Sequence, residues 1–600
     1  MLIGIDMGGT HIDGVAVKDN KIIKSIKHPV DRTDLYRTIL NAIYDLISDL
    51  DKAQISRVNL STTISTNAIV ENKTTAVDLI LQKGPGINFE FPEIVSEVNY
   101  IDGYVDHRGK MVKDLDYQQL ASLKKELNSS EKSKQDSSMP HQKNLAVVTK
   151  FSTRNPEHEE AIADYFAADY YQITQGHTLS GRLNFPRRVN TAFLNSAVHN
   201  IFQEFANNIT AALREAEISA PIYILKADGG TIPLADAIAR PVETILSGPA
   251  ASFMGMNALF DNRVDSVLLD IGGTTTDIFF LVDGVPVFEP AGITIGQHKT
   301  LVRAIYSVSI GLGGDSCLSI EKSLNNAAGL WTEDLSDKDN AFCSSSENYS
   351  AHDDLAAGIK IGPERKGAPL LFGGSVPTLT DAMSVLHKLD FNHLSAEQIM
   401  RARQGITEMA EQLELSAEDF AELVLKKAAH TIKNQVDCLL LQLNSQPVYT
   451  VREILADRQI KPAEVKVIGG PAKIMAGYLE QAFKLDVLLP EQFQVANAIG
   501  AALAQPTMEL NLLADTQRKI LIIPELNIYE KIGSRYSLDE GRKYVLQCLK
   551  RAAKELSDSK LETEIVEESS FNMVDGYSSG KNIRIKAQIK PGLSCTIEQE

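Results

Sequence analysis

The chain has 600 residues, 44% hydrophobic and 23% charged, a globular composition that excludes a disordered or fibrous protein. Its formal charge of −18 disfavours nucleic acid or an anionic membrane as a main partner. Five widely spaced cysteines without a C-x-x-C pair argue against a disulfide framework or a structural zinc site. We expect a multidomain, soluble, cytoplasmic protein, because neither a secretory signal nor a membrane-length apolar run is seen.

The first motif follows a short apolar strand and reads Asp6-Met-Gly-Gly-Thr-His-Ile-Asp13. Paired glycines let the backbone turn tightly and bring N–H groups close to an anion, and a threonine hydroxyl adds a donor. A carboxylate at a strand end can organise Mg²⁺ through water. One such turn is equally compatible with a simple hairpin. Gly8, Gly9 and Thr10 are candidate phosphate-binding residues, and Asp6 is a candidate catalytic and metal-binding residue.

The elements between this motif and the middle of the chain alternate between strands and helices. Apolar periodicity predicts a hairpin over residues 12–25, helices over 35–50, 156–167 and 189–216, and strands over 57–61, 77–81, 145–148 and 222–226. The polar composition of residues 128–143 predicts an exposed loop. A polar turn, Ser61-Thr-Thr-Ile-Ser-Thr-Asn67, follows one strand, and Ala227-Asp-Gly-Gly-Thr231 follows another. A helix of small residues is expected to begin at Ser247.

The first motif recurs as Asp270-Ile-Gly-Gly-Thr-Thr-Thr-Asp277, again after an apolar strand. Two copies indicate two related halves that close on one phosphorylated ligand. The residues expected to surround the β- and γ-phosphates are Gly272, Gly273, Thr274 and Thr275, and Asp270 is the second candidate catalytic and metal-binding residue. Asp13 and Asp277 are either ligands or turn-forming caps.

The rest of the chain continues the alternation. We expect a polar surface insertion over residues 332–354, a helix over 411–441, a strand over 465–468 that leads into Gly469-Gly-Pro471, and a small-residue helix over 494–502. After two phosphate loops, Gly469 and Gly470 become candidates for holding adenosine, since glycine lets a base lie on the backbone. From about residue 517 a strand, a charged amphipathic helix (538–556) and a strand-like tail predict a small α+β appendage.

The order of these glycine turns and small-residue helices resembles the superfamily of actin, sugar kinases and heat-shock chaperone ATPases. Longer motifs resemble the hydantoinase A/oxoprolinase family over about residues 2–505. They are the segments already quoted, together with Arg240-Pro-Val-Glu-Thr-Ile-Leu-Ser-Gly-Pro-Ala250, Ser309-Ile-Gly-Leu-Gly-Gly-Asp-Ser316, Ile361-Gly-Pro-Glu364 and Pro377-Thr-Leu-Thr-Asp-Ala382. The resemblance implies an α/β fold of two actin-like (ribonuclease H-like) ATPase halves around a nucleotide cleft.

The resemblance also implies an activity: ATP, with Mg²⁺, phosphorylates the carbonyl of a cyclic amide such as a hydantoin or 5-oxoproline. It implies a separate hydantoinase B-type subunit, and we expect an oligomer. The candidate substrate-binding residues are Thr62, Thr63, Thr66 and Asp228. The alternatives are a ketone-carboxylase ATPase subunit, a small-molecule kinase and an ATP-driven switch of the chaperone type.

The expected domains are residues 1–190, which hold the first phosphate loop, residues 191–505, which hold the second phosphate and adenosine loops, and the appendage, residues 506–600. Three further side chains have both functional and structural interpretations. His11 lies within the first motif and His177 within the region of the resemblance, but local packing or exposure is the better explanation of each, and Cys317 is better explained as a buried thiol than as a nucleophile.

Overall fold

The structure is a computed structural model that describes most of the chain. The residues outside the described part are Thr10 and residues 32–33, 87–88, 92–93, 95–97, 133–142, 261–262, 290, 321–357, 387–393, 446–458, 557–560, 576–577 and 599–600. The expected insertion at 332–354 lies outside it. The chain forms two compact units: unit 1 comprises Met1–Ala258, Phe288–Ile305 and Asn497–Glu600, and unit 2 comprises Leu259–Val287 and Tyr306–Ala496. Each unit is built from several separate segments of the sequence, whereas each of the three expected domains is one continuous segment. The bounds of those three domains stay a proposal.

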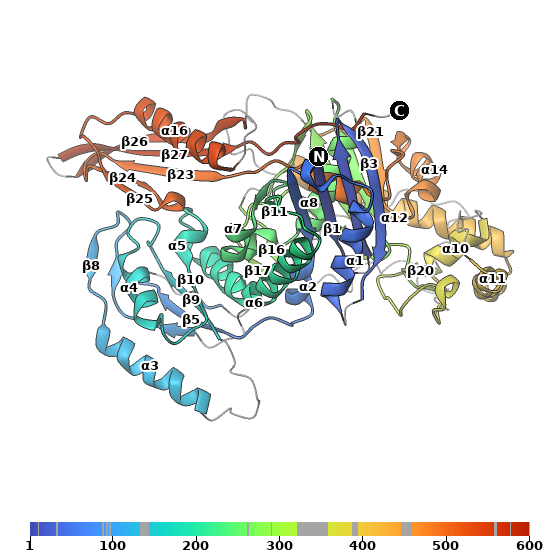
Figure 1. The fold of residues 1–600 in the computed structure, drawn as a ribbon, viewed down its shortest axis with the longest axis horizontal. Helices are drawn as coiled ribbons and strands as arrows, with labels where there is room; N and C mark the ends of the chain where they lie inside the picture. The colour runs from blue at the N-terminus through green and yellow to red at the C-terminus, as the bar shows by residue number, and fades with distance from the viewer. Residues whose placement is uncertain are drawn as a thin grey trace. The chain divides into compact units, whose positions relative to one another are not determined.

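The main sheet of unit 1 has the strand order β12-β11-β4-β1-β2-β3. The strands are β1 (Leu2–Met7), β2 (His11–Lys18), β3 (Lys21–Pro29), β4 (Arg57–Thr62), β11 (Ile222–Leu225) and β12 (Thr231–Pro233). β1 pairs antiparallel with β2 and parallel with β4, and β4 pairs parallel with β11. Helices α1 (Leu35–Ile47) and α6 (Phe185–Glu215) contribute apolar side chains to the core that covers this sheet (Figure 1).

A second sheet of unit 1 is entirely parallel, in the order β10-β9-β5-β6. Its strands are β5 (Val77–Gln82), β6 (Val98–Tyr100), β9 (Asn144–Thr149) and β10 (Gln172–Gln175), and its helices are α3 (Tyr117–Lys132), α4 (Glu157–Phe166) and α5 (Gly176–Leu179). A short hairpin, β7 (Tyr104–Val105) and β8 (Met111–Lys113), follows β6. The central strand β9 is buried along its whole length, as expected for a sheet covered on both faces.

The C-terminal part of unit 1 is an antiparallel sheet, β25-β24-β23-β27-β26, covered by one amphipathic helix (Figure 1). Its elements are β23 (Glu509–Asp515), β24 (Ile520–Ile523), β25 (Ile528–Lys531), α16 (Leu538–Leu556), β26 (Thr563–Asp575) and β27 (Ser578–Ile589). This confirms the small α+β appendage, and α16 begins and ends where its apolar periodicity predicted.

Unit 2 repeats the strand arrangement of the main sheet of unit 1. Its sheet has the order β15-β14-β13-β21-β22, and β18 also pairs with β14. The strands are β13 (Ser266–Ile271), β14 (Thr276–Val282), β15 (Val285–Pro286), β18 (Ser307–Ile310), β21 (Glu464–Ile468) and β22 (Asp486–Leu488). β13 is antiparallel to β14 and parallel to β21, as β1 is to β2 and β4. Two sheets with the same order and directions confirm the α/β, ribonuclease H-like fold class.

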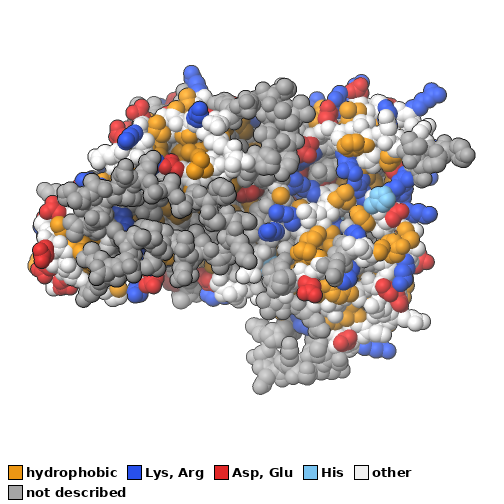
Figure 2. Space-filling view, turned by 180° about the vertical axis from the view of Figure 1, so that it is seen from behind, with side chains coloured by type: hydrophobic (Ala, Val, Ile, Leu, Met, Phe, Trp, Pro, Cys, Tyr) orange, Lys and Arg blue, Asp and Glu red, His pale blue; other side chains and the backbone are white. Residues whose placement is uncertain are grey.

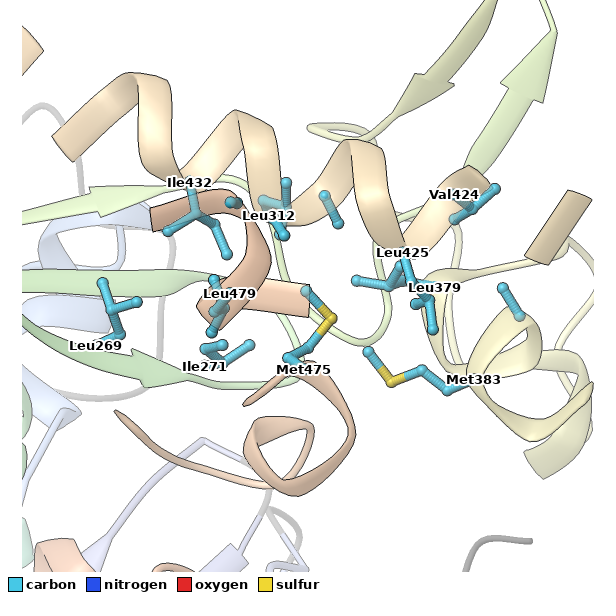
Figure 3. Close-up of a cluster of buried hydrophobic side chains, with 14 of the residues drawn as sticks. Leu269, Ile271, Leu312, Leu379, Met383, Val424, Leu425, Ile432, Met475 and Leu479 are labelled. Carbon is cyan, nitrogen blue, oxygen red and sulfur yellow. The ribbon is translucent and has the colours of Figure 1, made fainter. Parts of the chain in front are cut away.

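The core of unit 2 lies where helices pack on this sheet. The helices are α10 (Leu379–Leu386), α11 (Ala396–Glu411), α12 (Ala417–Ser445) and α14 (Ala472–Phe483). Leu269 and Ile271 of β13 point toward Met475 and Leu479 of α14, and Ile432 of α12 lies over them (Figure 3). Each of these five side chains is essentially inaccessible to solvent, so the apolar strand that precedes the second motif is fixed by the core of its own unit.

The small-residue helices, α8 (Ser247–Leu259) and α15 (Ala496–Leu503), approach closely, as their composition predicted. A Cβ at Gly500 would lie 2.1 Å from the Ala251 carbonyl oxygen, and a Cβ at Gly4 of β1 would lie 2.1 Å from that of Ala498. Only glycine fits at these two points.

Three sequence-based expectations for local structure were wrong. The segment after β4 is not a polar turn, because residues 64–70 form helix α2 (Ile64–Val70). Residues 128–132, expected in a loop, continue α3. The helix expected over 411–441 is split between α11 and α12 at Glu414, whose φ is +58°. Apolar periodicity continues across such a break, because both helices turn the same face to one core.

Acidic and basic side chains are interspersed with apolar ones on the face of the molecule shown in Figure 2. Within the described part of the chain, no helix is both long and apolar enough to cross a membrane. Cys317, Cys548 and Cys595 carry free thiols, and Cys317 is buried, as expected for a packing residue.

Candidate functional site

The second Asp-Gly-Gly-Thr motif forms the connection between β13 and β14 in unit 2. Asp270 and Asp277 are directly opposite each other in the antiparallel ladder. The turn is closed by a 2.9 Å hydrogen bond that the Gly272 N–H donates to the Thr275 carbonyl, while Gly273 and Thr274 are exposed. The backbone at the tip of this turn is therefore accessible to a ligand.

A second glycine loop, residues 311–316, packs against this turn. The Gly314 N–H donates to the Gly272 carbonyl at 3.0 Å, and the Asp315 N–H donates to the Gly273 carbonyl. A Cβ at Gly313 would lie 2.7 Å from the Gly273 backbone, so the close approach requires glycine. The sequence marked this loop only through family resemblance; its contacts with the second motif were not predicted.

The third glycine turn joins β21 to α14 and lies against Asp270. Gly469 has a φ of +98°, and a Cβ there would lie 2.2 Å from the Ile271 carbonyl oxygen and 2.8 Å from Asp270 Oδ1. Gly470 is exposed, and a Cβ there would have no neighbour within 4 Å. A Cβ at Gly314 would also lie 3.5 Å from Pro471. Unit 2 thus brings together these three glycine turns, although they are about 40 to 200 residues apart in the sequence.

The carboxylates of this cluster repel one another. Burial and the negative charge of Asp270 raise the pKa of Asp277 to about 7, although Ser309 donates a hydrogen bond to it. Burial also raises the pKa of Asp315, and this effect is opposed by Arg365, whose Nη2 lies 3.0 Å from Asp315 Oδ2. A bound cation would relieve the repulsion between Asp270 and Asp277.

Carboxylate oxygens suit Mg²⁺, which keeps several waters and needs only one or two protein carboxylates. Among the described residues, no three His, Cys, Asp or Glu side chains converge as a metal cage. The Asp270–Asp277 pair therefore fits Mg²⁺ held together with phosphate and water, and does not fit a site enclosed by protein ligands.

The first motif forms the equivalent hairpin in unit 1, with Asp6 opposite Asp13. The Gly8 N–H donates to the His11 carbonyl at 3.0 Å, and Thr10 lies outside the described residues. Here the second aspartate has a cationic partner, because Lys27 of β3 donates to both Asp13 oxygens at 2.8 and 3.0 Å. Burial raises the pKa of Asp13, and Lys27 opposes the rise. The exposed His11 has its pKa lowered by partial burial and by Lys27.

The Ser/Thr segment adjoins the first motif, since the Thr63 N–H donates to the Met7 carbonyl at 3.3 Å. Its hydroxyls have partners within unit 1. Thr66 Oγ1 accepts from the Leu246 N–H at 3.0 Å, and Thr63 Oγ1 accepts from the Asn67 amide at 3.1 Å. The Thr62 carbonyl accepts from Ser247 at 2.8 Å, which ties the end of β4 to the start of α8. These contacts hold the β4–α2 connection in place, and a substrate role for the threonines stays a proposal.

Asp228 is buried at the same edge of the main sheet, after β11. It accepts from the Gly230 N–H at 3.0 Å and lies 3.3 Å from both Lys226 Nζ and Thr507 Oγ1. Burial opposes its ionisation, but Lys226 and Arg303 hold its pKa below the usual value. These contacts tie β11 to the segment that leads into β23.

His177 is also buried, and its Nδ1 is hydrogen-bonded to Glu159, whose carboxylate accepts the Thr149 and His177 N–H groups at 2.8 and 2.9 Å. The pair joins α4 and α5 to the end of β9. This pairing was not foreseen from the sequence.

Comparisons with known proteins agree with this architecture. One curated relative is the acetophenone carboxylase gamma subunit of Aromatoleum aromaticum (strain DSM 19018 / LMG 30748 / EbN1), which is 22% identical over 436 residues. The match covers 64% of this chain and 53% of that protein, so the chain spans about half the length of the curated relative that it matches.

Two solved structures share the fold. The nucleotide-free structure of acetone carboxylase, an enzyme of ATP-dependent acetone carboxylation, has a TM-score of 0.65 at 15% identity over 98% of this chain and 87% of that one. The ATP-dependent caprolactamase from Pseudomonas jessenii has a TM-score of 0.67 at 18% identity over 100% of this chain and 89% of that one.

Two family models match nearly the whole of residues 2–510. The hydantoinase/oxoprolinase N-terminal region matches residues 2–168, and the hydantoinase/oxoprolinase model matches residues 188–329 and 347–510. The chain belongs to the hydantoinase/oxoprolinase family.

Proposed function

We propose that this chain is the ATP-binding subunit of an ATP-dependent hydrolase that phosphorylates the carbonyl oxygen of a cyclic amide. The observation that carries the proposal is the convergence of three glycine turns on Asp270 in unit 2. Exposed backbone at Gly273 and Thr274 beside a repelling carboxylate pair is the arrangement that a Mg²⁺-bound phosphate chain requires.

Each element of this cluster has a proposed role. The β- and γ-phosphates are bound by the backbone N–H groups and hydroxyls of residues 272–275, and adenosine lies on the turn at Gly469 and Gly470. Asp270 would hold Mg²⁺ through water, and the ion would supply positive charge beside the transferred phosphoryl group. In unit 1, Gly8, Gly9 and Thr10 form the second phosphate-binding turn, and Asp6 is the corresponding carboxylate.

The proposed reaction is one that an amide carbonyl needs. Amide resonance makes the carbonyl carbon a poor electrophile. When the carbonyl oxygen attacks the γ-phosphorus, an O–P bond forms, the bond to the β-phosphate oxygen breaks and ADP leaves. The oxygen then becomes part of a leaving group, so that water can add to the carbon. Positioning and electrostatic stabilisation suffice for the phosphoryl transfer.

We place the cyclic amide near Thr62, Thr63 and Thr66, whose segment adjoins the first motif, with Asp228 at the same sheet edge. Hydantoins and 5-oxoproline are the proposed substrate class, from the family to which the chain belongs. The caprolactamase of the same fold is named for a lactam, which supports an amide carbonyl.

A ketone-carboxylase ATPase subunit is the second candidate. It is favoured by the curated relative, which is a subunit of acetophenone carboxylase. In that case the phosphate acceptor is an enolate oxygen, and the phosphate-binding residues keep their roles.

Replacing Asp270 by alanine tests the nucleotide site. We expect Asp270→Ala to abolish Mg-ATP binding and hydrolysis while the protein keeps its circular dichroism spectrum, because the carboxylate lies at the surface of the glycine cluster and not in the core. Isothermal titration calorimetry and phosphate release measure the two effects. Asp486→Ala is the matched control, since Asp486 is an exposed aspartate of the same unit. ATP turnover at the wild-type rate in Asp270→Ala would remove the second motif from the site.

Screening the acceptor separates the two candidates. ATPase activity is measured with hydantoin, 5-oxoproline and caprolactam, and separately with acetone or acetophenone plus bicarbonate. ATPase activity that is stimulated only by the cyclic amides supports the hydrolase. ATPase activity that is stimulated only by a ketone supports the carboxylase instead. A stable phosphorylated product in place of free phosphate indicates a kinase.

A further inference from the structure

Four arginines gather in unit 1 where the β7–β8 hairpin meets the turn after β23. Arg108 Nη2 lies 3.2 Å from Asp515 Oδ2 and donates to Gln517 Oε1 at 2.7 Å. From the other side, Arg518 Nη2 donates to the Gly109 carbonyl at 3.3 Å. The two turns are thus joined by reciprocal arginine contacts.

Arg154 lies in the same place, on the turn that follows β9, and is only 9% exposed. A Cβ at Gly109 would lie 2.8 Å from the Arg154 carbonyl, so this turn packs directly on the hairpin. Unlike Arg108, Arg154 makes no side-chain hydrogen bond or ion pair with any described residue. Its electrostatic neighbours are Arg584 of β27, which repels it, and Asp515.

The junction has an excess of positive charge. Asp515 is already engaged, because its Oδ1 accepts the Gln517 and Arg518 N–H groups at 3.0 and 2.9 Å, and its Oδ2 faces Arg108. Asp106 likewise accepts the backbone N–H groups of Arg108 and Lys110 at 2.8 and 2.9 Å. Arg518 Nη1 is buried without a hydrogen-bond partner among the described residues.

Buried guanidinium N–H groups without acceptors are costly, and so is a buried charge without a counter-ion. Burial and the charge of Arg584 lower the pKa of Arg154 to about 10, so the side chain stays protonated near pH 7. The guanidinium fork matches the two oxygens of a carboxylate or phosphate group.

We propose that Arg154, with Arg518 and Arg584, binds a small oxyanion, a carboxylate or phosphate group, at the junction of the β7–β8 hairpin, the β9 turn and the β23–β24 turn. This site lies away from all the glycine turns of the proposed nucleotide site in sequence. It does not depend on the proposed function.

The test measures the melting temperature of the full chain with inorganic phosphate or acetate, and with chloride at equal ionic strength. We expect at least one of the two oxyanions to raise the melting temperature saturably, whereas chloride should not. We expect Arg154→Leu to raise the dissociation constant for that oxyanion about tenfold or more. A response to acetate indicates that the site binds a carboxylate group, and a response to phosphate indicates that it binds a phosphate group. The Arg154→Leu chain should also melt higher than the wild type in anion-free buffer, because an uncompensated buried charge is removed.

Arg37→Leu is the matched control, because Arg37 is exposed on α1, and it should keep the wild-type anion response. Asp270→Ala should keep it as well. A response that is lost in Asp270→Ala but kept in Arg154→Leu would place the anion on the glycine turns and overturn the proposal. The proposal would also be overturned if Arg154→Leu lowered the melting temperature by the same amount in every buffer, since such a loss would show that Arg154 has only a structural role. If Arg154→Leu does not fold, Arg154→Lys keeps the charge without the fork and should still bind phosphate more weakly; wild-type affinity would overturn the proposal.

Discussion

Lys27 and Ser309 distinguish the two copies of the Asp-Gly-Gly-Thr motif. Each faces the second aspartate of its motif from the neighbouring antiparallel strand: Lys27 is opposite Asp13, and Ser309 is opposite Asp277. In unit 1 the side chain that faces the second aspartate carries a positive charge, whereas in unit 2 it is a hydroxyl. The repulsion between Asp270 and Asp277 supports the Mg²⁺ that we propose there.

The Asp13–Lys27 pair should show measurable coupling. We expect Lys27→Met and Asp13→Asn each to lower the free energy of unfolding by ~1 kcal/mol or less, because Lys27 is about half exposed and solvent screens the pair. The double variant should lose less than the sum, since removing both partners leaves no isolated charge. Denaturant unfolding of the four proteins measures this cycle. Additive losses would show that Lys27 does not neutralise Asp13.

His158 gives a pH dependence whose sign follows from burial. The side chain is 3% exposed and contacts Gln82 through Nδ1 at 2.8 Å, and burial lowers its pKa from 6.5. Below pH 6.5 the unfolded chain takes up a proton that the folded chain resists, so stability present above that pH is lost as the pH falls.

We expect the melting temperature of His158→Gln to fall less between pH 7.5 and pH 5 than that of the wild type. The difference is worth ~1.4 kcal/mol for each unit by which the pKa is lowered. His107→Gln is the control, since His107 is exposed. Equal slopes in all three proteins would contradict the assignment.

At the level of elements, the β21–α14 turn depends on one glycine and not on its neighbour. Gly469 combines a positive φ with contact to the Ile271 carbonyl and Asp270, whereas Gly470 has open space. We expect Gly469→Ala to lower the free energy of unfolding by at least ~2 kcal/mol and Gly470→Ala to change it by about 0.5 kcal/mol or less. Chemical denaturation compares them. Similar losses in both would indicate a propensity effect and not a steric one.

Helix α2 shows what an element adds to a motif. The sequence Ser61-Thr-Thr-Ile-Ser-Thr-Asn67 has the composition of a polar turn, yet residues 64–70 are helical. The contacts of Thr66 with Leu246 and of Thr62 with Ser247 hold this short helix against the start of α8. Local propensity is weak over seven residues, so contacts with distant segments determined its conformation.

At the level of the whole molecule, we propose that the activity depends on a second subunit. The chain covers about half of its curated relative, which is itself named as a subunit. We expect the isolated chain to bind Mg-ATP but to open hydantoin or 5-oxoproline slowly, and to gain ring-opening activity when a hydantoinase B-type protein is added. Product formation followed by chromatography measures this. Full ring opening by the isolated chain would exclude an obligatory partner.

The sequence by itself determined the local features: the two Asp-Gly-Gly-Thr hairpins, the glycines after β21 and the amphipathic helix α16. Each is encoded within a few residues, by the conformational freedom of glycine or by apolar periodicity. The tertiary structure alone decided which turns meet. The three turns at residues 272–275, 311–316 and 469–471 come together because their strands are neighbours in one sheet. Strand pairing likewise places Lys27 opposite Asp13 and Ser309 opposite Asp277. The same holds for the proposed anion site, in which Arg154 is more than 350 residues away in the sequence from Arg518 and Arg584, so no local pattern indicated the cluster.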